Sequence, residues 1–215
     1  MANQEGIKMS LAKEVDYKIT EMDYLNGERV SDVKHEYIDG IVYAMAGASE
    51  KHAIIAKNIM VGFENSLRKK QSPCIVLASD MKVRISDKST SYFYPDIAVY
   101  CDSHEYDSDY YKHSPVIIIE VLSQSTRRND FTTKMINYFN IASLEEYVLI
   151  EQNICQVQVY RKSDHWKAST YFPGDTIHFT SINTILSVED IYYQVNNADI
   201  VQYLQEKQDN IQPND

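Results

Sequence analysis

The strongest constraint on the fold is an apolar run that contains a single acid. Val116–Ile119 gives four consecutive β-branched residues, and Glu120 is followed by Val121 and Leu122, which continue the run. A strand buried on both faces of a sheet shows this unbroken apolar pattern. A carboxylate in such a strand is unfavourable unless it is paired, hydrogen-bonded or bound to a metal ion. Glu120 is therefore predicted to have a partner: a salt bridge, backbone amides or a metal.

A second acid stands at the head of another predicted strand. Asp96 follows Tyr94-Pro95 and precedes the apolar run Ile97–Tyr100. Magnesium needs only one or two carboxylates, with water and substrate phosphate oxygens completing its coordination. Asp96 and Glu120 on adjacent strands would supply that pair.

A lysine lies close behind these strands in the sequence. Arg127–Asn140 is a helix candidate with Ser125 or Thr126 as its cap, and it carries an apolar stripe. The stripe is formed by Phe131, Met135, Tyr138 and Phe139. At 100° per residue, Lys134 is expected at the margin of this stripe. Its stem could pack while its ammonium reaches water, or it could pair with Asp130 four residues earlier. Proximity to Glu120 favours a role at the site.

The remaining pattern predicts one α/β domain. Ser49 is placed to cap a long helix over about 50–70, whose predicted buried stripe is Ala56, Met60, Phe63 and Leu67. A hairpin is expected around Asp39-Gly40, and a short helix from Thr20 that ends at Asn26-Gly27. Further strands are expected at 74–78, 81–85, 92–100, 115–122, 146–150 and 155–160. A C-terminal hairpin is expected from 166–172 and 176–179, and Ser187 is placed to cap a terminal helical stretch.

We divide the chain into an N-terminal arm (1–17), the folded domain (18–195) and a helical, polar tail (196–215). At 215 residues it is long enough for one sizeable core. The three cysteines are far apart in the sequence, so neither a disulfide framework nor a zinc site is expected. A reducing, cytoplasmic location is expected instead. No apolar run reaches 18 residues, so neither export nor a membrane partner is expected.

The net charge of −10 opposes tight binding to nucleic acid, because phosphate neutralisation requires a basic surface. The acidity is partly concentrated in residues 102–109, and the basic residues are clustered. A nuclease that contacts DNA transiently stays compatible with this balance.

Several segments in order carry a resemblance to a known family. Pro95-Asp96 followed by Glu120-Val121-Leu122-Ser123 resembles the PD-(D/E)xK nuclease pattern, and the chain is similar to the Uma-type restriction endonucleases over roughly residues 18–195. The other matching pieces are Glu36–Gly40, Met45 with His52, Pro115–Glu120, Ser125-Thr126, Asp130, Lys134, Tyr138, Glu145–Tyr147 and Val159–Arg161. The parent motif has lysine where this chain has Leu122. In the family that lysine comes from the next helix, which corresponds to Lys134.

The resemblance implies a restriction-endonuclease-like core, with a central mixed β-sheet flanked by helices and with additional N- and C-terminal β-hairpins. It also implies a metal-dependent endonuclease that hydrolyses DNA phosphodiester bonds with Mg²⁺, for which Mn²⁺ could substitute, and that works as a homodimer. From the resemblance we expect Asp96 and Glu120 to hold the metal with the Val121 carbonyl, and Lys134 to orient or deprotonate the attacking water. Glu36 is expected as a further acid that binds through water or holds a second metal. His52 and Asp130 are expected to support the site.

Two other functions stay open at the level of the sequence. The first is a catalytically silent nuclease fold used as a binding or regulatory module, which the acidic charge would favour. The second is a metal-dependent hydrolase that acts on a smaller phosphoester.

Overall fold

A computed structural model describes residues 18–85, 90–102 and 108–211. The expected N-terminal arm, residues 103–107 of the acidic loop and the last four residues of the tail lie outside the described residues. A six-stranded mixed sheet forms the centre, in the order β11-β10-β9-β8-β6-β3. Its middle strands β8 (Ile117–Leu122) and β9 (Glu146–Glu151) run parallel, and its other neighbouring strands run antiparallel. The predicted α/β fold class with a central mixed sheet is confirmed.

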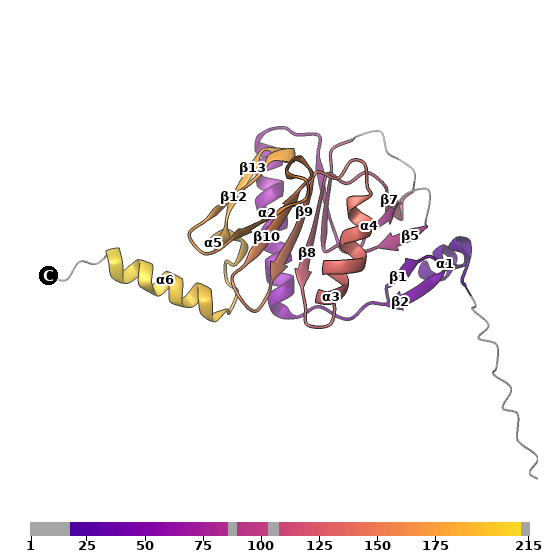
Figure 1. The fold of residues 1–215 in the computed structure, drawn as a ribbon, viewed down its shortest axis with the longest axis horizontal. Helices are drawn as coiled ribbons and strands as arrows, with labels where there is room; N and C mark the ends of the chain where they lie inside the picture. Colours follow the sequence, from indigo (N-terminus) through magenta and orange to yellow (C-terminus); the bar gives the residue numbers. More distant parts are fainter. Residues whose placement is uncertain (1–17, 86–89, 103–107, 212–215) are drawn as a thin grey trace, which may run out of the picture.

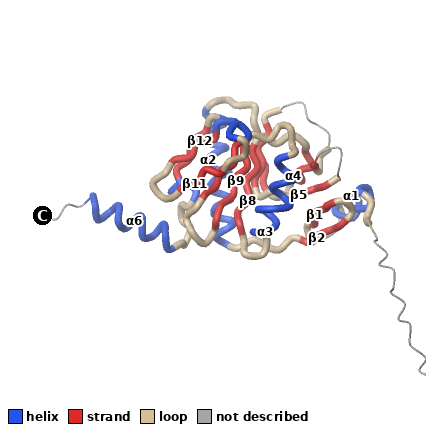
Figure 2. Tube along the Cα trace, in the orientation of Figure 1, coloured by secondary structure: helices blue, strands red, loops and turns tan. Residues whose placement is uncertain are grey.

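All six residues of β8 are buried, because helices cover both faces of the sheet (Figures 1 and 2). The helix α2 (Glu50–Lys69) packs on the face that carries Ile117, Ile119 and Val121. The opposite face, with Ile118 and Leu122, packs against the segment from α3 (Arg127–Asn129) through a π-helix (Asp130–Lys134) to α4 (Met135–Phe139). The side-chain period of two along the strand therefore feeds two separate apolar layers.

The long helix begins as predicted, with the Ser49 hydroxyl accepting a hydrogen bond from the His52 amide. Its fully buried residues are Ile55, Ile59, Phe63 and Leu67. The predicted stripe was right for the last two and one position off for the first two, since Ala56 and Met60 lie partly buried beside the true stripe. The neighbouring isoleucines provide the larger apolar surface, and they take the centre of the interface.

A second, five-stranded sheet has the order β2-β1-β5-β4-β7. The strands β1 (His35–Ile38) and β2 (Ile41–Ala44) form the predicted hairpin, and both turn residues have positive φ: 50° at Asp39 and 96° at Gly40. The other members are β4 (Lys82–Ile85), β5 (Ser91–Phe93) and β7 (Tyr111–Lys112), and helix α1 (Glu21–Glu28) precedes the sheet. The predicted end of this helix at Asn26-Gly27 is wrong, because it continues to Glu28.

The predicted single strand over 92–100 is wrong in a way that matters for the site. The chain forms β5 in one sheet and β6 (Ile97–Tyr100) in the other, with Tyr94-Pro95-Asp96 as the crossing. Proline has no N–H for a ladder hydrogen bond, so a sheet strand is readily broken there. The crossing puts Asp96 where the two sheets meet.

C-terminal hairpins are present, but the predicted pairing of 166–172 with 176–179 is wrong. The strand β11 (Ala168–Tyr171) pairs with β10 (Val157–Arg161), and β12 (Thr176–Phe179) pairs with β13 (Thr184–Ser187). Buried Glu146 fixes this arrangement. Its carboxylate accepts hydrogen bonds from the backbone amides of Thr180 and Ser181 and from the Arg161 guanidinium. The remaining elements are β3 (Ile75–Ala78), 3-10 turns at Lys162–Asp164 and Thr180–Ile182, α5 (Val188–Ile191) and α6 (Ala198–Ile211). Figure 1 shows α6 extending away from the body of the molecule.

The cysteine prediction needs a correction. Cys74 and Cys101 form a disulfide, and Cys155 is a buried free thiol. The antiparallel register pairs Ile75 with Tyr100, so it places the residues just outside β3 and β6 directly opposite each other. Spacing along the chain did not reveal this pair because the contact is made across two strands. None of the described helices is long and apolar enough to span a membrane.

Candidate functional site

A cleft of about 1010 Å³ opens between the β1–β2 hairpin, the first turn of α2 and the π-helix. Its lining contains all seven site residues predicted from the sequence: Glu36, His52, Asp96, Glu120, Val121, Asp130 and Lys134. They come from both sheets and both helical layers. Far-apart parts of the chain therefore supply one chemical centre.

Asp96 is held at both of its carboxylate oxygens. The Val121 amide donates to Oδ2 at 2.7 Å, and Nε2 of His52 lies 2.8 Å from Oδ1. The first contact follows from the pairing of β6 with β8, in which Ile97 lies opposite Ile119. The Val121 carbonyl was expected as a metal ligand, whereas the contact that the structure shows is through its N–H. His52 comes from α2 and fixes the other side of the carboxylate.

Glu120 is 3% exposed and points its carboxylate toward the π-helix layer. Its Oε1 accepts hydrogen bonds from Lys134 Nζ at 3.1 Å and from the Tyr138 hydroxyl at 2.9 Å. Burial raises the pKa of this carboxyl well above its usual range, and the Lys134 charge only partly opposes that rise. Among the alternatives left open for Glu120, the structure shows the buried ion pair.

Lys134 is as deeply buried as the acid, with 5% of its side chain exposed. Its Nζ lies 2.9 Å from Glu36 Oε1, 3.1 Å from Glu120 Oε1 and 3.4 Å from Asp130 Oδ1. Burial alone would lower the pKa of the ammonium, but the three carboxylates outweigh burial and raise it. This lysine is therefore held as a cation.

The expected position of Lys134 at the margin of the apolar stripe is wrong, because the helix is not α-helical there. Asp130–Lys134 is a π-helix, and Asp130, Lys134 and Tyr138 are the buried residues of this helical segment. In an α-helix a step of four residues overshoots one turn. In a π-helix, whose bonds run from i to i+5, the same step falls short of one turn. The two deviations offset each other, so all three side chains face the sheet.

The donor chemistry fits a hard divalent cation. Glu36, Asp96, Glu120 and Asp130 bring four carboxylates into one electrostatic cluster around a single lysine, and oxygen donors of this kind suit Mg²⁺ or Mn²⁺. Burial also raises the pKa of Glu36 and that of Asp130, as expected for negative charge in excess. Within the described ranges no three His, Cys, Asp or Glu side chains are arranged as a ready metal cage. A metal would thus use a pair of carboxylates plus water and substrate.

The structure adds residues that the sequence did not single out as members of the site. Tyr138 binds Glu120, Tyr147 donates to the Asp130 carbonyl at 2.9 Å, and Gln152 donates to the Leu122 carbonyl at 3.0 Å. Gln152 also accepts the Ser49 hydroxyl, so it links the end of β9 to the cap of α2. The spacing of Tyr138, four residues after Lys134, was the available signal for the first.

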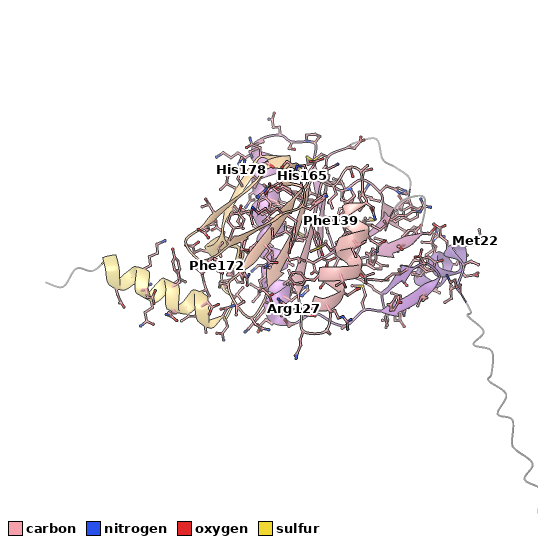
Figure 3. The ribbon with its side chains drawn as sticks, viewed as in Figure 1. Met22, Arg127, Phe139, His165, Phe172 and His178 are labelled. Carbon is pink, nitrogen blue, oxygen red and sulfur yellow. A yellow bond between two sulfur atoms is a disulfide. The ribbon has the colours of Figure 1, made fainter. Side chains whose placement is uncertain are left out.

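Other basic and imidazole side chains lie outside this centre. Arg127 projects from α3 at the edge of the molecule in Figure 3, where it pairs with Glu151. His165 and His178 lie over the C-terminal strands, away from the labelled Arg127. Lys34 lines the cleft and pairs with Asp80.

A family model named Uma2 and described as "Putative restriction endonuclease" matches residues 21–185. The chain is 32% identical to the uncharacterized protein slr1290 of Synechocystis sp. over 177 residues, covering 81% of this chain and 92% of that protein. It is 34% identical over 146 residues to the uncharacterized protein sll1609 of the same organism, covering 67% and 81%. A crystal structure from Anabaena variabilis, described as "a putative nuclease belonging to DUF820", superposes with a TM-score of 0.61 at 19% identity. That match covers 75% of this chain and 91% of the other, and it confirms the fold.

Proposed function

Because this chain belongs to the Uma2 restriction endonuclease family, we propose that it is an endonuclease that hydrolyses DNA phosphodiester bonds with a divalent metal ion. The observation that carries the proposal is the placement of Asp96, just before β6, and Glu120, on the neighbouring strand β8, in one cleft beside a buried lysine. Neither the fold nor the family name alone would assign these roles.

Asp96 and Glu120 are the residues that would hold the metal ion. When bound there, Mg²⁺ or Mn²⁺ would act as a Lewis acid on a phosphate oxygen and lower the pKa of a water molecule. Val121 and His52 fix the carboxylate of Asp96 before any ligand arrives, so little reorganisation is needed on binding.

Lys134 supplies positive charge next to the reacting phosphate. Its ammonium is surrounded by carboxylates that keep it protonated, so it stabilises developing negative charge and orients the attacking water by donating hydrogen bonds. General-base action by this lysine, the other sequence expectation, is disfavoured by the same contacts.

DNA is the proposed substrate, bound transiently because the net charge is −10. The expected homodimer, in which two sites would meet two strands, stays a prediction that sedimentation of the purified chain would test.

The test is cleavage of plasmid and short duplex DNA by the purified chain in Mg²⁺, in Mn²⁺ and in EDTA. Cleavage is expected with either metal, none is expected in EDTA, and Asp96→Asn and Glu120→Gln should each lower the rate by at least about 100-fold. Glu145→Gln, which removes an exposed carboxylate just before β9, is the matched control and should cleave like the wild type. Wild-type rates in both site variants would reject the assignment. Activity only on mononucleotide esters, run as a parallel panel, would favour the smaller phosphoester instead.

A further inference from the structure

Glu36 and Asp130 contact the site in a different way from Asp96. Both have a carboxylate oxygen on the Lys134 ammonium, Glu36 at 2.9 Å and Asp130 at 3.4 Å, and they reach it from β1 and from the π-helix. The Asp96 carboxylate instead contacts His52 and Val121. The acids thus divide into two groups that share only Glu120, which lies beside Asp96 and binds the lysine.

We propose that Glu36 and Asp130 are positioning residues that hold the Lys134 ammonium, and that they are not ligands of the metal ion. This inference rests on the proposed function of Asp96 and Glu120 as the metal-holding pair. It reassigns Glu36, for which the sequence suggested a water-mediated or second metal.

The number of N–H donors on the Lys134 ammonium supports this division of the acids. An ammonium carries three N–H donors, and three carboxylates surround it. A metal ion held by Glu120 would repel the ammonium and weaken the Lys134–Glu120 contact. Glu36 and Asp130 would keep the ammonium in the cleft, and the N–H that points to Glu120 would be available for a phosphate oxygen.

Glu36 and Asp130 are both buried, so their negative charges need a compensating cation inside the protein. The Glu36 and Asp130 side chains are 8% and 2% exposed. Glu36 Oε1 and Asp130 Oδ1 have no hydrogen bond of good geometry to the residues described, although both lie within ion-pair distance of Nζ. Lys134 is therefore the cation that compensates their charge, and these two carboxylates hold it electrostatically in addition to its hydrogen bond to Glu120.

The first experiment titrates Mn²⁺, without DNA, into metal-free full-length protein by calorimetry. Asp96→Asn and Glu120→Gln should weaken Mn²⁺ binding more than about tenfold, whereas Glu36→Gln and Asp130→Asn should stay within about fivefold of wild type. Asp32→Asn, which removes an exposed acid from the same cleft, controls for the loss of a general negative charge. Equal weakening by Glu36→Gln and Glu120→Gln would overturn the proposal and assign Glu36 to the metal.

Cleavage kinetics separate positioning from a structural effect. Glu36→Gln and Asp130→Asn should lower kcat by about 10- to 100-fold while the KM for DNA and the half-saturating Mn²⁺ concentration stay near wild type. Glu36→Asp, which keeps the charge but shortens the stem, should recover part of kcat. A change in KM alone would contradict the inference.

A double-mutant cycle tests the contact with Lys134 even if the chain cleaves nothing. In EDTA, Glu36→Gln should raise Tm by several degrees more in a Lys134→Met background than in wild type, because it then removes an uncompensated buried charge. The same shift in both backgrounds would reject the contact. If Lys134→Met does not fold, Lys134→Gln serves for the cycle. Absence of any Mn²⁺ binding would reject the proposed function, whereas additive Tm shifts would reject only this inference.

Discussion

Three buried carboxylates compete for one ammonium at the centre of the cleft. Glu120 shares Lys134 with Glu36 and Asp130, and it accepts one further hydrogen bond from Tyr138. A charged group that is buried with incomplete compensation lowers the stability of the folded chain. The buried charge on Glu120 that the proposed chemistry uses therefore lowers the stability of the fold.

We expect Glu120→Gln to stabilise the metal-free protein at pH 8. Burial raises the pKa of Glu120 above the ordinary value of 4.5, so the folded state holds its proton more tightly than the unfolded state. The contribution of protonated Glu120 to the stability of the fold is therefore fully present below pH 4.5, and it is lost as pH rises through the folded-state pKa. Glutamine cannot ionise, so the variant should gain about 1 kcal/mol, or about 2–4 °C in Tm, at pH 8.

The measurement is thermal denaturation in EDTA at pH 8 and pH 4.5, with Glu145→Gln as the exposed control. The advantage of Glu120→Gln should shrink to near zero at the lower pH. A variant that is less stable than wild type at pH 8 would mean that the ion pair with Lys134 outweighs the burial of the carboxylate.

Tyr138, an uncharged residue, also holds the Glu120 carboxylate. The Tyr138 hydroxyl donates to Glu120 Oε1 at 2.9 Å in a fully buried position, beside the hydrogen bond from Lys134. Tyr138→Phe should keep the fold but lower kcat by about 3- to 30-fold, because Glu120 loses one of the two groups that orient it. Steady-state cleavage assays would measure this. Tyr160→Phe, which removes a hydroxyl that donates to Gln158, is the matched control, and an effect of equal size there would count against a site-specific role.

At the scale of elements, the sequence predicted the residues of the site better than the elements that carry them. Asp96 and Glu120 were predicted because an acid in an apolar strand is conspicuous, and the structure brings both to one cleft. The break between β5 and β6 was missed, since a short apolar segment does not reveal which sheet each half joins. The hydrogen bond from Tyr138 had one local signal, its spacing of four residues after Lys134, but that spacing alone does not show that both side chains reach Glu120.

We expect the π-helix itself to set the direction of Lys134. Deleting Thr132, an exposed residue inside Asp130–Lys134, would let the segment relax to an α-helix. In that α-helix Asp130 would lie three residues before Lys134, about 60° away around the axis, so its carboxylate would move off the ammonium. Cleavage should then fall by about 10- to 100-fold, as for Asp130→Asn, with near-wild-type helix content by circular dichroism.

Thr132→Ala is the matched control, because it removes the γ-methyl and the hydroxyl that donates to the Arg128 carbonyl at 2.6 Å but keeps the number of residues in the helix. Its rate should stay within about threefold of wild type. A folded deletion variant that cleaves as fast as the control would show that Lys134 does not depend on the π-helix for its position.

At the scale of the whole molecule, pairing between distant strands escaped the sequence. The C-terminal strands pair as β10–β11 and β12–β13 because Glu146 fixes residues 180–181 from the centre of the sheet. The Cys74–Cys101 disulfide is another such contact, made only because β3 and β6 are neighbours. Alternation and turn residues report local structure, and neither reports which strands become neighbours.

The disulfide leads to a prediction for the stability of the whole chain. It joins residues 27 apart in sequence, and closing a loop of that size removes conformational entropy from the unfolded chain. The oxidised protein should be more stable than the reduced protein by about 3–4 kcal/mol in urea unfolding. Thiol titration in denaturant should find one thiol, that of Cys155, before reduction and three after it.

Reduction should leave the chemistry almost unchanged, and this separates a structural crosslink from a switch. Cys101 follows the far end of β6, and Asp96 precedes its start, so at about 3.3 Å per residue the two lie about 16 Å apart along the strand. The β6–β8 pairing, which presents Asp96 to Val121, does not involve the cysteines. Cleavage by the reduced protein, and by a Cys74→Ser/Cys101→Ser variant, should stay within about twofold of the oxidised protein at 25 °C. Three free thiols in the purified, unreduced chain would contradict the crosslink itself, and a large loss of cleavage on reduction would show that the sheet transmits the bond to the site.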